Sequence, residues 1–361
     1  MARRATAATP DPFKQPNEEI VMTSHSDLTA LFRANFELCE IGPGQSVAVL
    51  SEGELLPDYR AASLSAVSAL GAEALDINIP TKNAQDASHR IANLGENPLS
   101  QHPEAVQQCK DADMVVDHML LLFSHEQIEM QEAGTRILMI VEPVEVLERL
   151  FPSTALRRRV EAAEQKFIAA NSLRFTNEAG SDVSYRLGDK PILTEYGYTT
   201  QPGRWDHWPG GFIASLAAEN GVDGRVVMAP GDIVFPLKCY VEEPIEYVIN
   251  GGWVKEINGG RQAAELSEFM DGYGDPRAYA VSHIGWGLNE KCVWDPDLPG
   301  IGMDGRAHYG NVLFSLGPDT EFGGDNDTSC HLDLPMQNCN LWLDDELIVE
   351  GGEVVPAELR A

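Results

Sequence analysis

The sequence predicts a mixed α/β protein, in which an N-terminal α/β domain built on a parallel sheet precedes a β-rich domain. Two observations support this. Up to about residue 145, apolar runs of strand length alternate with helical patterns, which is typical of a parallel sheet covered on both faces. From residue 171 onward, short strands punctuated by glycines dominate. We therefore expect a disordered segment at 1–17, the α/β domain with connector helices at 18–170, and the β-rich domain at 171–361.

Four apolar runs are the expected strands of the N-terminal half. They are Gln45–Leu50, Ala74–Pro80, Met114–Phe123 and Arg136–Val141. Helical patterns lie between them at Tyr59–Leu70, Pro103–Ala112 and His125–Ala133, with Ser124 placed to cap the last, and Val144–Ala170 is predicted to be a helical connector. No G-x-G-x-x-G motif follows the first strand, so nothing indicates a dinucleotide site.

The C-terminal half is predicted to be a succession of strands, with its best helical pattern at Gln262–Met270. The expected strands are Asp182–Leu187, Ile192–Tyr198, Arg225–Ala229, Ile233–Tyr240, Glu246–Asn250, Trp253–Ile257, Tyr279–Trp286, Tyr309–Leu316, Thr328–Leu334 and Leu341–Leu343.

Charge and cysteine usage narrow the class of protein. The formal net charge is −30, from 56 acidic and 26 basic residues, which argues against nucleic acid or an anionic membrane as a partner. Six cysteines occur without C-x-x-C spacing, which disfavours both a disulfide framework and a thiolate zinc site. The paired arginines near the start are not followed by the apolar run of a signal peptide. We expect a cytoplasmic protein that forms a homo-oligomer.

A His-x-Asp pair near the C-terminus is the first candidate for chemistry. If this stretch is extended, His331 and Asp333 share one face and can converge on a single metal ion. Cys330, Leu332 and Leu334 then turn to the opposite, packed side. A hydrogen-bonded pair without a metal is the alternative, and it is the more common role of such a pair taken alone.

A second histidine can complete this set. His283 would share a strand face with Gly285 and Gly287, and we expect the two glycines to leave an open pocket beside its imidazole, although a core histidine is an equal alternative. Together with His331 and Asp333 it gives two imidazoles and one carboxylate, the ligand set of non-haem Fe(II) oxygenases. Because the same residue types also hold catalytic zinc, both metals stay open.

Two further histidines lie in distinctive contexts. His207 sits in Arg204–Gly211, where Pro-Gly-Gly should prevent a helix or strand, so we expect a loop whose tryptophans and polar groups form a wall for a flat polar ring. A purely structural loop is the alternative. His118, next to Asp117 in an apolar run, is either a buried structural histidine or a general base, and the pattern alone favours the former.

Several motifs together resemble the 2,5-dihydroxypyridine 5,6-dioxygenases of nicotinate and nicotine breakdown. They are Asp117-His118, Ile192–Glu195, Trp205–Gly211, Ser282–Leu288, Gly310–Ser315 and His331-Leu-Asp333, and the similarity spans most of residues 20–345. The resemblance implies an Fe(II) enzyme of the extradiol type that opens the ring of 2,5-dihydroxypyridine with O₂ to give N-formylmaleamic acid. It would place metal and catalysis in the 171–361 domain.

The resemblance also implies residue roles. His283, His331 and Asp333 would bind Fe(II), and His118, Glu195, His207 and Ser315 would line the substrate site, with His118 as the acid/base. Such chemistry needs a base with a pKa near the working pH beside the ring hydroxyl, for which histidine is suited.

Two other classes remain as alternatives. The wider architecture resembles the aminopeptidase T metallopeptidases, which hold two metals, and Glu268 or Asp232 would then be candidates for the second one. A metal-stabilised binding protein without catalysis is the other. One iron per chain would indicate the dioxygenase, whereas two divalent ions would indicate the peptidase.

Overall fold

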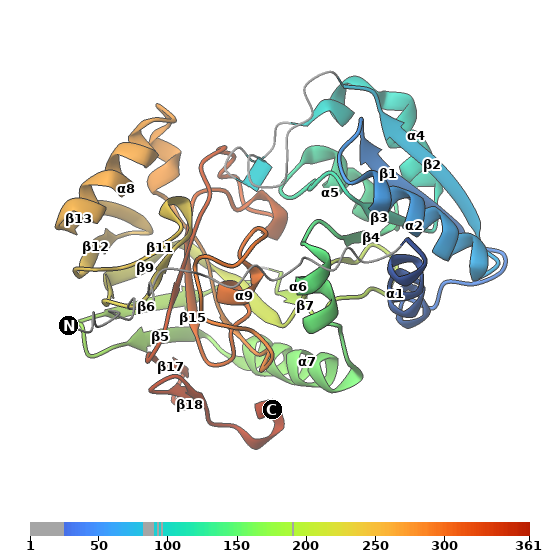
Figure 1. Ribbon diagram of the computed structural model, residues 1–361. Helices are drawn as coiled ribbons and strands as arrows, with labels where there is room; N and C mark the ends of the chain where they lie inside the picture. Colours follow the sequence, from blue (N-terminus) through green and yellow to red (C-terminus); the bar gives the residue numbers. More distant parts are fainter. Residues whose placement is uncertain (1–24, 82–89, 92–93, 95–96, 190) are drawn as a thin grey trace, which may run out of the picture.

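The computed structural model describes residues 25–361, apart from 82–89, 92–93, 95–96 and 190. It confirms the predicted fold class, because a parallel sheet with helices (blue to green in Figure 1) is followed by a large antiparallel β region (green to red). The segment 1–17, predicted to be disordered, lies outside the described residues.

The parallel sheet has the strand order β2-β1-β3-β4-β8. Its strands are β1 (Ser46–Glu52), β2 (Glu73–Ile79), β3 (Met114–Asp117), β4 (Arg136–Met139) and β8 (Trp205–His207). Helices α1 (His25–Leu38) and α2 (Pro57–Ala69) share one apolar core with one face of this sheet, and α4 (Pro103–Asp111) and α5 (His125–Glu132) share another core with the opposite face. Every residue of β3 and β4 is buried, as expected for strands covered on both sides.

The edge strand β8 corrects the prediction for the tryptophan-containing stretch. Trp205–His207 is a strand, not an irregular loop, and pairs in parallel with Ile137–Met139 of β4. The chain therefore returns from its C-terminal half to complete the N-terminal sheet. Pro209 and the glycines that follow it end the strand. The prediction that Pro-Gly-Gly prevents regular structure was therefore correct only for the residues after His207.

The apolar run Met114–Phe123 is also not one strand. β3 ends at Asp117, whose carboxylate accepts hydrogen bonds from the backbone N–H groups of Met119 at 2.7 Å and Leu121 at 2.8 Å. Leu120 and Phe123 have positive φ angles of 59° and 57°. A buried turn is as apolar as a buried strand, so the composition of this run did not reveal the turn.

The connector Val144–Ala170 consists of two helices, α6 (Val144–Arg149) and α7 (Thr154–Ala169). The Ser153 hydroxyl accepts a hydrogen bond from the backbone N–H of Leu156 at 3.1 Å and so begins α7. The predicted cap at Ser124 is confirmed in the same way, because its Oγ accepts from the N–H of Gln127 at 3.1 Å.

The β region forms a sheet with the order β16-β15-β14-β9-β6-β5-β17-β18-β19, to which β7, β12 and β13 are attached. The strands are β5 (Ser172–Thr176), β6 (Asp182–Leu187), β7 (Leu193–Glu195), β9 (Phe212–Met228), β12 (Ile245–Asn250), β13 (Trp253–Gly259), β14 (Val281–Gly287), β15 (Val312–Leu316), β16 (Leu332–Met336), β17 (Asn340–Leu343), β18 (Glu346–Glu350) and β19 (Glu353–Val354). The two longer helical turns in this half are α8 (Arg261–Asp271) and α9 (Met303–Arg306).

Most predicted strands of this half are confirmed within a few residues, with two kinds of error. β5, β18, β19 and residues 212–224 of β9 were missed, and the missed part of β9 ends in a polar, glycine-containing stretch. The stretch Ile233–Tyr240 is a small hairpin of β10 (Ile233–Val234) and β11 (Cys239–Tyr240) around a 3-10 turn at Phe235–Leu237. Among the described helices, none has the length and apolar character needed to cross a membrane.

Candidate metal centre

Three neighbouring strands bring the predicted metal ligands together. His283 lies in β14 and Asp333 in β16, on either side of β15, and His331 lies just before β16 begins. One potential ligand atom from each of the three side chains lies within 4.8 Å of the others, and all three residues are buried. Cys330, as predicted, is in the opposite apolar core. The structure thus confirms that these residues converge, while binding of a metal stays a prediction.

The tautomer of His283 suits a ligand. The Ser282 hydroxyl donates its proton to the carbonyl oxygen of Pro318, so at 3.2 Å from His283 Nδ1 it can only accept from an Nδ1–H. The lone pair is therefore on Nε2, which lies 3.3 Å from Asp333 Oδ1. Burial lowers the pKa of His283, although Asp333 opposes this, which favours the neutral imidazole that metals require.

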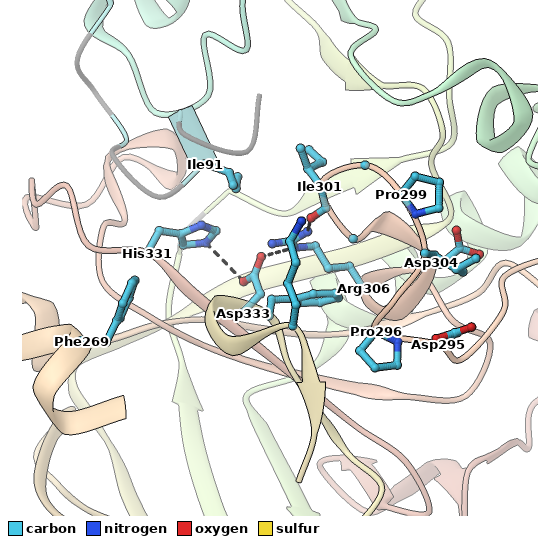
Figure 2. Close-up of a pocket in the computed structure, with 15 residues that line it drawn as sticks. Ile91, Phe269, Asp295, Pro296, Pro299, Ile301, Asp304, Arg306, His331 and Asp333 are labelled. Carbon is cyan, nitrogen blue, oxygen red and sulfur yellow. Dashed lines mark hydrogen bonds and ion pairs between the residues drawn. The ribbon is translucent and has the colours of Figure 1, made fainter. Parts of the chain in front are cut away.

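Asp333 is held as a carboxylate. Burial would raise its pKa, but the electrostatic influence of the neighbouring His331 and the positive charge of Arg306 outweigh burial and hold the pKa well below the usual range. Arg306 Nε donates to Oδ2 at 2.5 Å, and Ser315 Oγ donates to Oδ1 at 2.5 Å (Figure 2 shows the arginine contact). Oδ1 is the oxygen that faces both imidazoles.

His331 carries the strongest sign that a cation belongs here. Its Nε2 lies 3.2 Å from Asp333 Oδ1, yet neither ring nitrogen makes a directed hydrogen bond to any residue that the structure describes. Ser315 Oγ has one proton for two acceptors, because it also lies 2.8 Å from the lone pair on His283 Nε2. Buried polar atoms normally have partners, and a divalent cation would satisfy these nitrogen and oxygen lone pairs together. The donor set therefore fits the implied metal.

The glycines beside His283 do not form an open pocket, contrary to our expectation. A side chain at Gly285 would collide with the backbone of Ile213 in β9, and one at Gly287 would collide with the backbone at Ala307. The two glycines instead allow neighbouring backbone to approach closely.

Two adjoining cavities meet at His331, Asp333 and Arg306. The outer cavity is lined further by residues such as Phe235, Phe269, Pro296 and Pro299 (Figure 2). The inner cavity lies between strands of both sheets. Its apolar walls are Leu122, Phe123, Met139, Leu193, Trp205, Phe212, Ile301, Met303, Leu313 and Phe322, and its polar groups are Glu195, His207, His283, Arg306, Glu321, His331 and Asp333.

Glu195 and His207, both predicted for the substrate site, do line the inner cavity. Burial, with the nearby charges of Asp206 and Glu321, raises the pKa of Glu195 well above its usual value, which favours the protonated acid. Burial lowers the pKa of His207 to about 3, so its imidazole is also neutral. Glu195 Oε2 and His207 Nε2 have no hydrogen-bond partner in the described part of the chain. They are therefore available to a ligand.

Comparisons with known proteins decide the family. The family model of 2,5-dihydroxypyridine 5,6-dioxygenase matches residues 27–356. The chain belongs to this family. The 2,5-dihydroxypyridine 5,6-dioxygenase of Pseudomonas putida KT2440 is 42% identical over 346 residues, which are 94% of this chain and 99% of that one. The solved structure of the 2,5-dihydroxypyridine dioxygenase from that strain superposes with a TM-score of 0.89, at 41% identity, covering 93% of this chain and 99% of the other.

A more distant solved structure shares the fold. Wild-type AmpT from Thermus thermophilus gives a TM-score of 0.61 at 14% identity, covering 91% of this chain and 99% of that one, which indicates a shared fold. Glu268 is exposed on α8, and Asp232 accepts backbone hydrogen bonds from Ala229 and Gln337. Neither lines the two cavities around His331. Within the described residues, His283, His331 and Asp333 (the trio) are the one group of three or more potential ligands that converge, and neither acid belongs to it.

His118, predicted as the acid/base, is placed elsewhere, and this corrects the expectation that it lines the substrate site. Its Nδ1–H donates to the carbonyl oxygen of Ile140 at 2.8 Å, and its Nε2 accepts from Ser63 Oγ at 3.0 Å. Its ring packs against Phe32 and Tyr59 beneath α1 and α2, and it lines neither cavity. β3 ends at Asp117, and the side chain of the next residue, His118, points to the face of the sheet that α1 and α2 cover.

The structure adds residues that sequence reasoning missed. Phe123, at the far end of the same apolar run, faces His331 with its ring centroid 5.3 Å from the imidazole. Arg306 anchors Asp333 and lies 4.5 Å from the ring centroid of Phe235. Glu321 joins Glu195 in the inner cavity. A lone arginine in a glycine-rich stretch and a lone glutamate carry no motif, so only their spatial positions identify them.

Proposed function

We propose that this protein is a 2,5-dihydroxypyridine 5,6-dioxygenase that uses one Fe(II), held by His283, His331 and Asp333, to convert 2,5-dihydroxypyridine and O₂ to N-formylmaleamic acid. The observation that carries the proposal is the buried trio of two imidazoles and one carboxylate at the wall of a largely apolar cavity, in a chain of this family. Bound there, Fe(II) would supply the redox centre through which ring electrons reach O₂, which zinc cannot do.

The protein's own groups would set the charge at this centre. Two neutral imidazoles and one carboxylate leave a divalent ion with net positive charge, which favours a substrate bound as an anion. Arg306 balances Asp333 from the side away from the imidazoles. Ser282 fixes the tautomer of His283, so the lone pair points at Asp333 before any ion binds.

The inner cavity would orient a flat, polar ring. Trp205, Phe212 and Phe322 supply apolar surface and exclude water. In its protonated form, which the raised pKa favours, Glu195 can donate a hydrogen bond, and neutral His207 can donate or accept one, so the two suit the hydroxyl, carbonyl and N–H groups of a hydroxypyridine. Ser315 lines neither cavity, and its hydroxyl, which donates to Asp333 and lies 2.8 Å from His283 Nε2, would hold these two metal ligands in place. Because His118 is outside the cavity, we assign it no part in catalysis.

A cytoplasmic location is part of the proposal. All six cysteines are free thiols, and five of them are buried, with burial raising the pKa of Cys39 and Cys109 to about 12. Such thiols are unreactive and need no oxidising compartment.

The test is anaerobic reconstitution with Fe(II), followed by 2,5-dihydroxypyridine and then air. We expect one iron per chain, loss of the substrate's ultraviolet absorbance and uptake of one O₂ per substrate. Iron-loaded protein that takes up no O₂ would overturn the proposed function, and two divalent ions per chain would overturn the mononuclear centre.

A further inference from the structure

Glu321 lies in the wall between the inner cavity and a groove on the protein surface. The groove is formed by residues including Gln131, Pro191, Thr194 and Arg204. Four residues line both spaces, namely Leu193, Trp205, Glu321 and Phe322. Of these four, only Glu321 can take up and release a proton. It belongs to the short 3-10 turn Thr320–Phe322, whose last residue stacks on His283 with ring centroids 5.2 Å apart.

The Glu321 carboxyl is held by one oxygen only. Gln127 Nε2 donates to Oε1 at 2.8 Å and, with its other hydrogen, to Gln131 Oε1 at 3.1 Å. Both hydrogens of that amide are therefore used, and Gln127 itself is fixed in the first turn of α5 by Ser124. Oε2 of Glu321 is buried and has no hydrogen-bond partner among the residues described here. The oxygen that can exchange a proton is thus Oε2.

The titratable and charged groups around Glu321 differ on its two sides. The inner cavity contributes Glu195 from β7, His207 from β8, Arg306 from α9 and the trio itself, whereas the groove contributes Arg204. Arg204 is already paired with Asp206 at 2.8 Å. Burial raises the pKa of Glu321 to about 7, against the hydrogen bond from Gln127, which lowers it. Both protonation states are therefore populated at neutral pH.

The reaction needs a group that accepts a proton and passes it on. This requirement rests on the proposed function. Every atom of the neutral substrate and of O₂ is retained in the product acid, and O₂ is the only oxidant. The new carboxyl group ionises at neutral pH, since carboxyl pKa values lie near about 4. The substrate enters neutral and the product leaves as a carboxylate, so each turnover releases one proton overall, and the largely apolar walls of the inner cavity make an unpaired charge there costly.

We propose that Glu321 carries this proton from the inner cavity to the surface groove. Its Oε2 accepts the proton on the cavity side and releases it to water in the groove, while Gln127 holds Oε1 in place. The proton route is then separate from the outer cavity, which is lined by Asp333 and His331 and shares no lining residue with the groove. Glu321 is a catalytic residue in this scheme, and Gln127 is a positioning residue.

The experiment compares iron-loaded wild type with Glu321→Gln, which keeps the shape of the side chain and removes its titration. We expect kcat to fall roughly a hundredfold to ten-thousandfold, as for a lost acid/base group, with KM nearly unchanged and a larger solvent isotope effect. A pH indicator should show delayed proton release in a single turnover. Infrared difference spectra should lose the band of a protonated carboxyl.

The matched control is Glu126→Gln, which removes the same charge one residue from Gln127 but lies outside both cavities and the groove. It should behave as wild type. Gln127→Met provides a second test that keeps Glu321. Without the amide hydrogen bond the pKa of Glu321 rises, so the acidic limb of the kcat–pH profile should move to higher pH.

The outcomes separate the two proposals. If wild type with bound iron takes up no O₂ with 2,5-dihydroxypyridine, the proposed function fails, whatever the infrared band shows. If wild type is active and Glu321→Gln matches it in kcat, isotope effect and proton release, the relay is wrong. An unmoved pH limb in Gln127→Met also contradicts it, and this result does not depend on whether Glu321→Gln folds.

Discussion

Two buried histidines of this protein have almost the same exposure and opposite surroundings. His118, beneath α1 and α2, is 3% exposed, and His331, at the inner cavity, is 7% exposed. Both nitrogens of His118 are satisfied by Ser63 and Ile140, whereas those of His331 lack directed hydrogen bonds to described residues. The difference teaches that burial and a perturbed pKa do not identify a reactive histidine. The partners of the ring nitrogens do.

The largest expected effect is at the proposed metal ligands, His331 and Asp333. His331→Ala or Asp333→Ala should lose bound iron and activity together, because two remaining ligands cannot hold a labile ion such as Fe(II). We expect activity to fall by more than the roughly tenfold to hundredfold seen when only an outer partner of a ligand is lost. Metal analysis and O₂ uptake on the same preparation measure this. Stoichiometric iron in both variants would end the ligand assignment.

A smaller effect is expected at His207, which faces the inner cavity without belonging to the trio. His207→Ala should keep iron but lower kcat/KM about tenfold to a hundredfold, because a buried hydrogen bond to the ring, worth about 1–3 kcal/mol, is lost. His308→Ala is the matched control, since that half-buried histidine also has an unpartnered Nδ1 but lies outside both cavities. Equal kinetics for the two variants would return His207 to a structural role.

The smallest effect on turnover is expected at His118. His118→Asn should leave the rate per iron nearly unchanged and lower the free energy of unfolding by about 1–3 kcal/mol, because Ser63 or Ile140 loses its partner. Thermal or urea unfolding measures the loss. A normal stability with a rate that falls a hundredfold would show that His118 is catalytic after all.

The pH dependence of that stability loss sharpens the same test. Burial lowers the pKa of His118 from 6.5 to about 4, so between these values the unfolded chain binds a proton that the folded protein does not. The stabilisation that His118 contributes is therefore fully present above about pH 6.5 and is lost as the pH falls toward 4. The difference in unfolding free energy between wild type and His118→Asn should shrink over this window. A constant difference would contradict the buried, neutral imidazole.

Much of the fold was readable from local patterns. The mostly apolar run of β4 and the helix cap at Ser124 could be predicted, because a strand buried on both faces and the start of a helix each have a short, specific sequence pattern. The approach of His331 to Asp333 was predictable for the same reason, since two residues apart in extended chain share a face. Where a buried segment is irregular, as at Leu120 and Phe123, its apolar composition led to the wrong prediction of a continuous strand.

The sequence by itself determined the fold class, the family motifs and the identity of the three convergent side chains, because these depend on residue type and short spacing. Only the tertiary structure decided that Trp205–His207 joins the parallel sheet, that Arg306 anchors Asp333, that Glu321 borders both cavity and groove, and that His118 lies on the far face of its sheet. Each of these depends on strands and turns distant in the chain, and on which side of a strand a side chain emerges. If β3 ended one residue earlier or later, the side chain of His118 would point to the opposite face of the sheet. No local pattern in the sequence specifies where β3 ends.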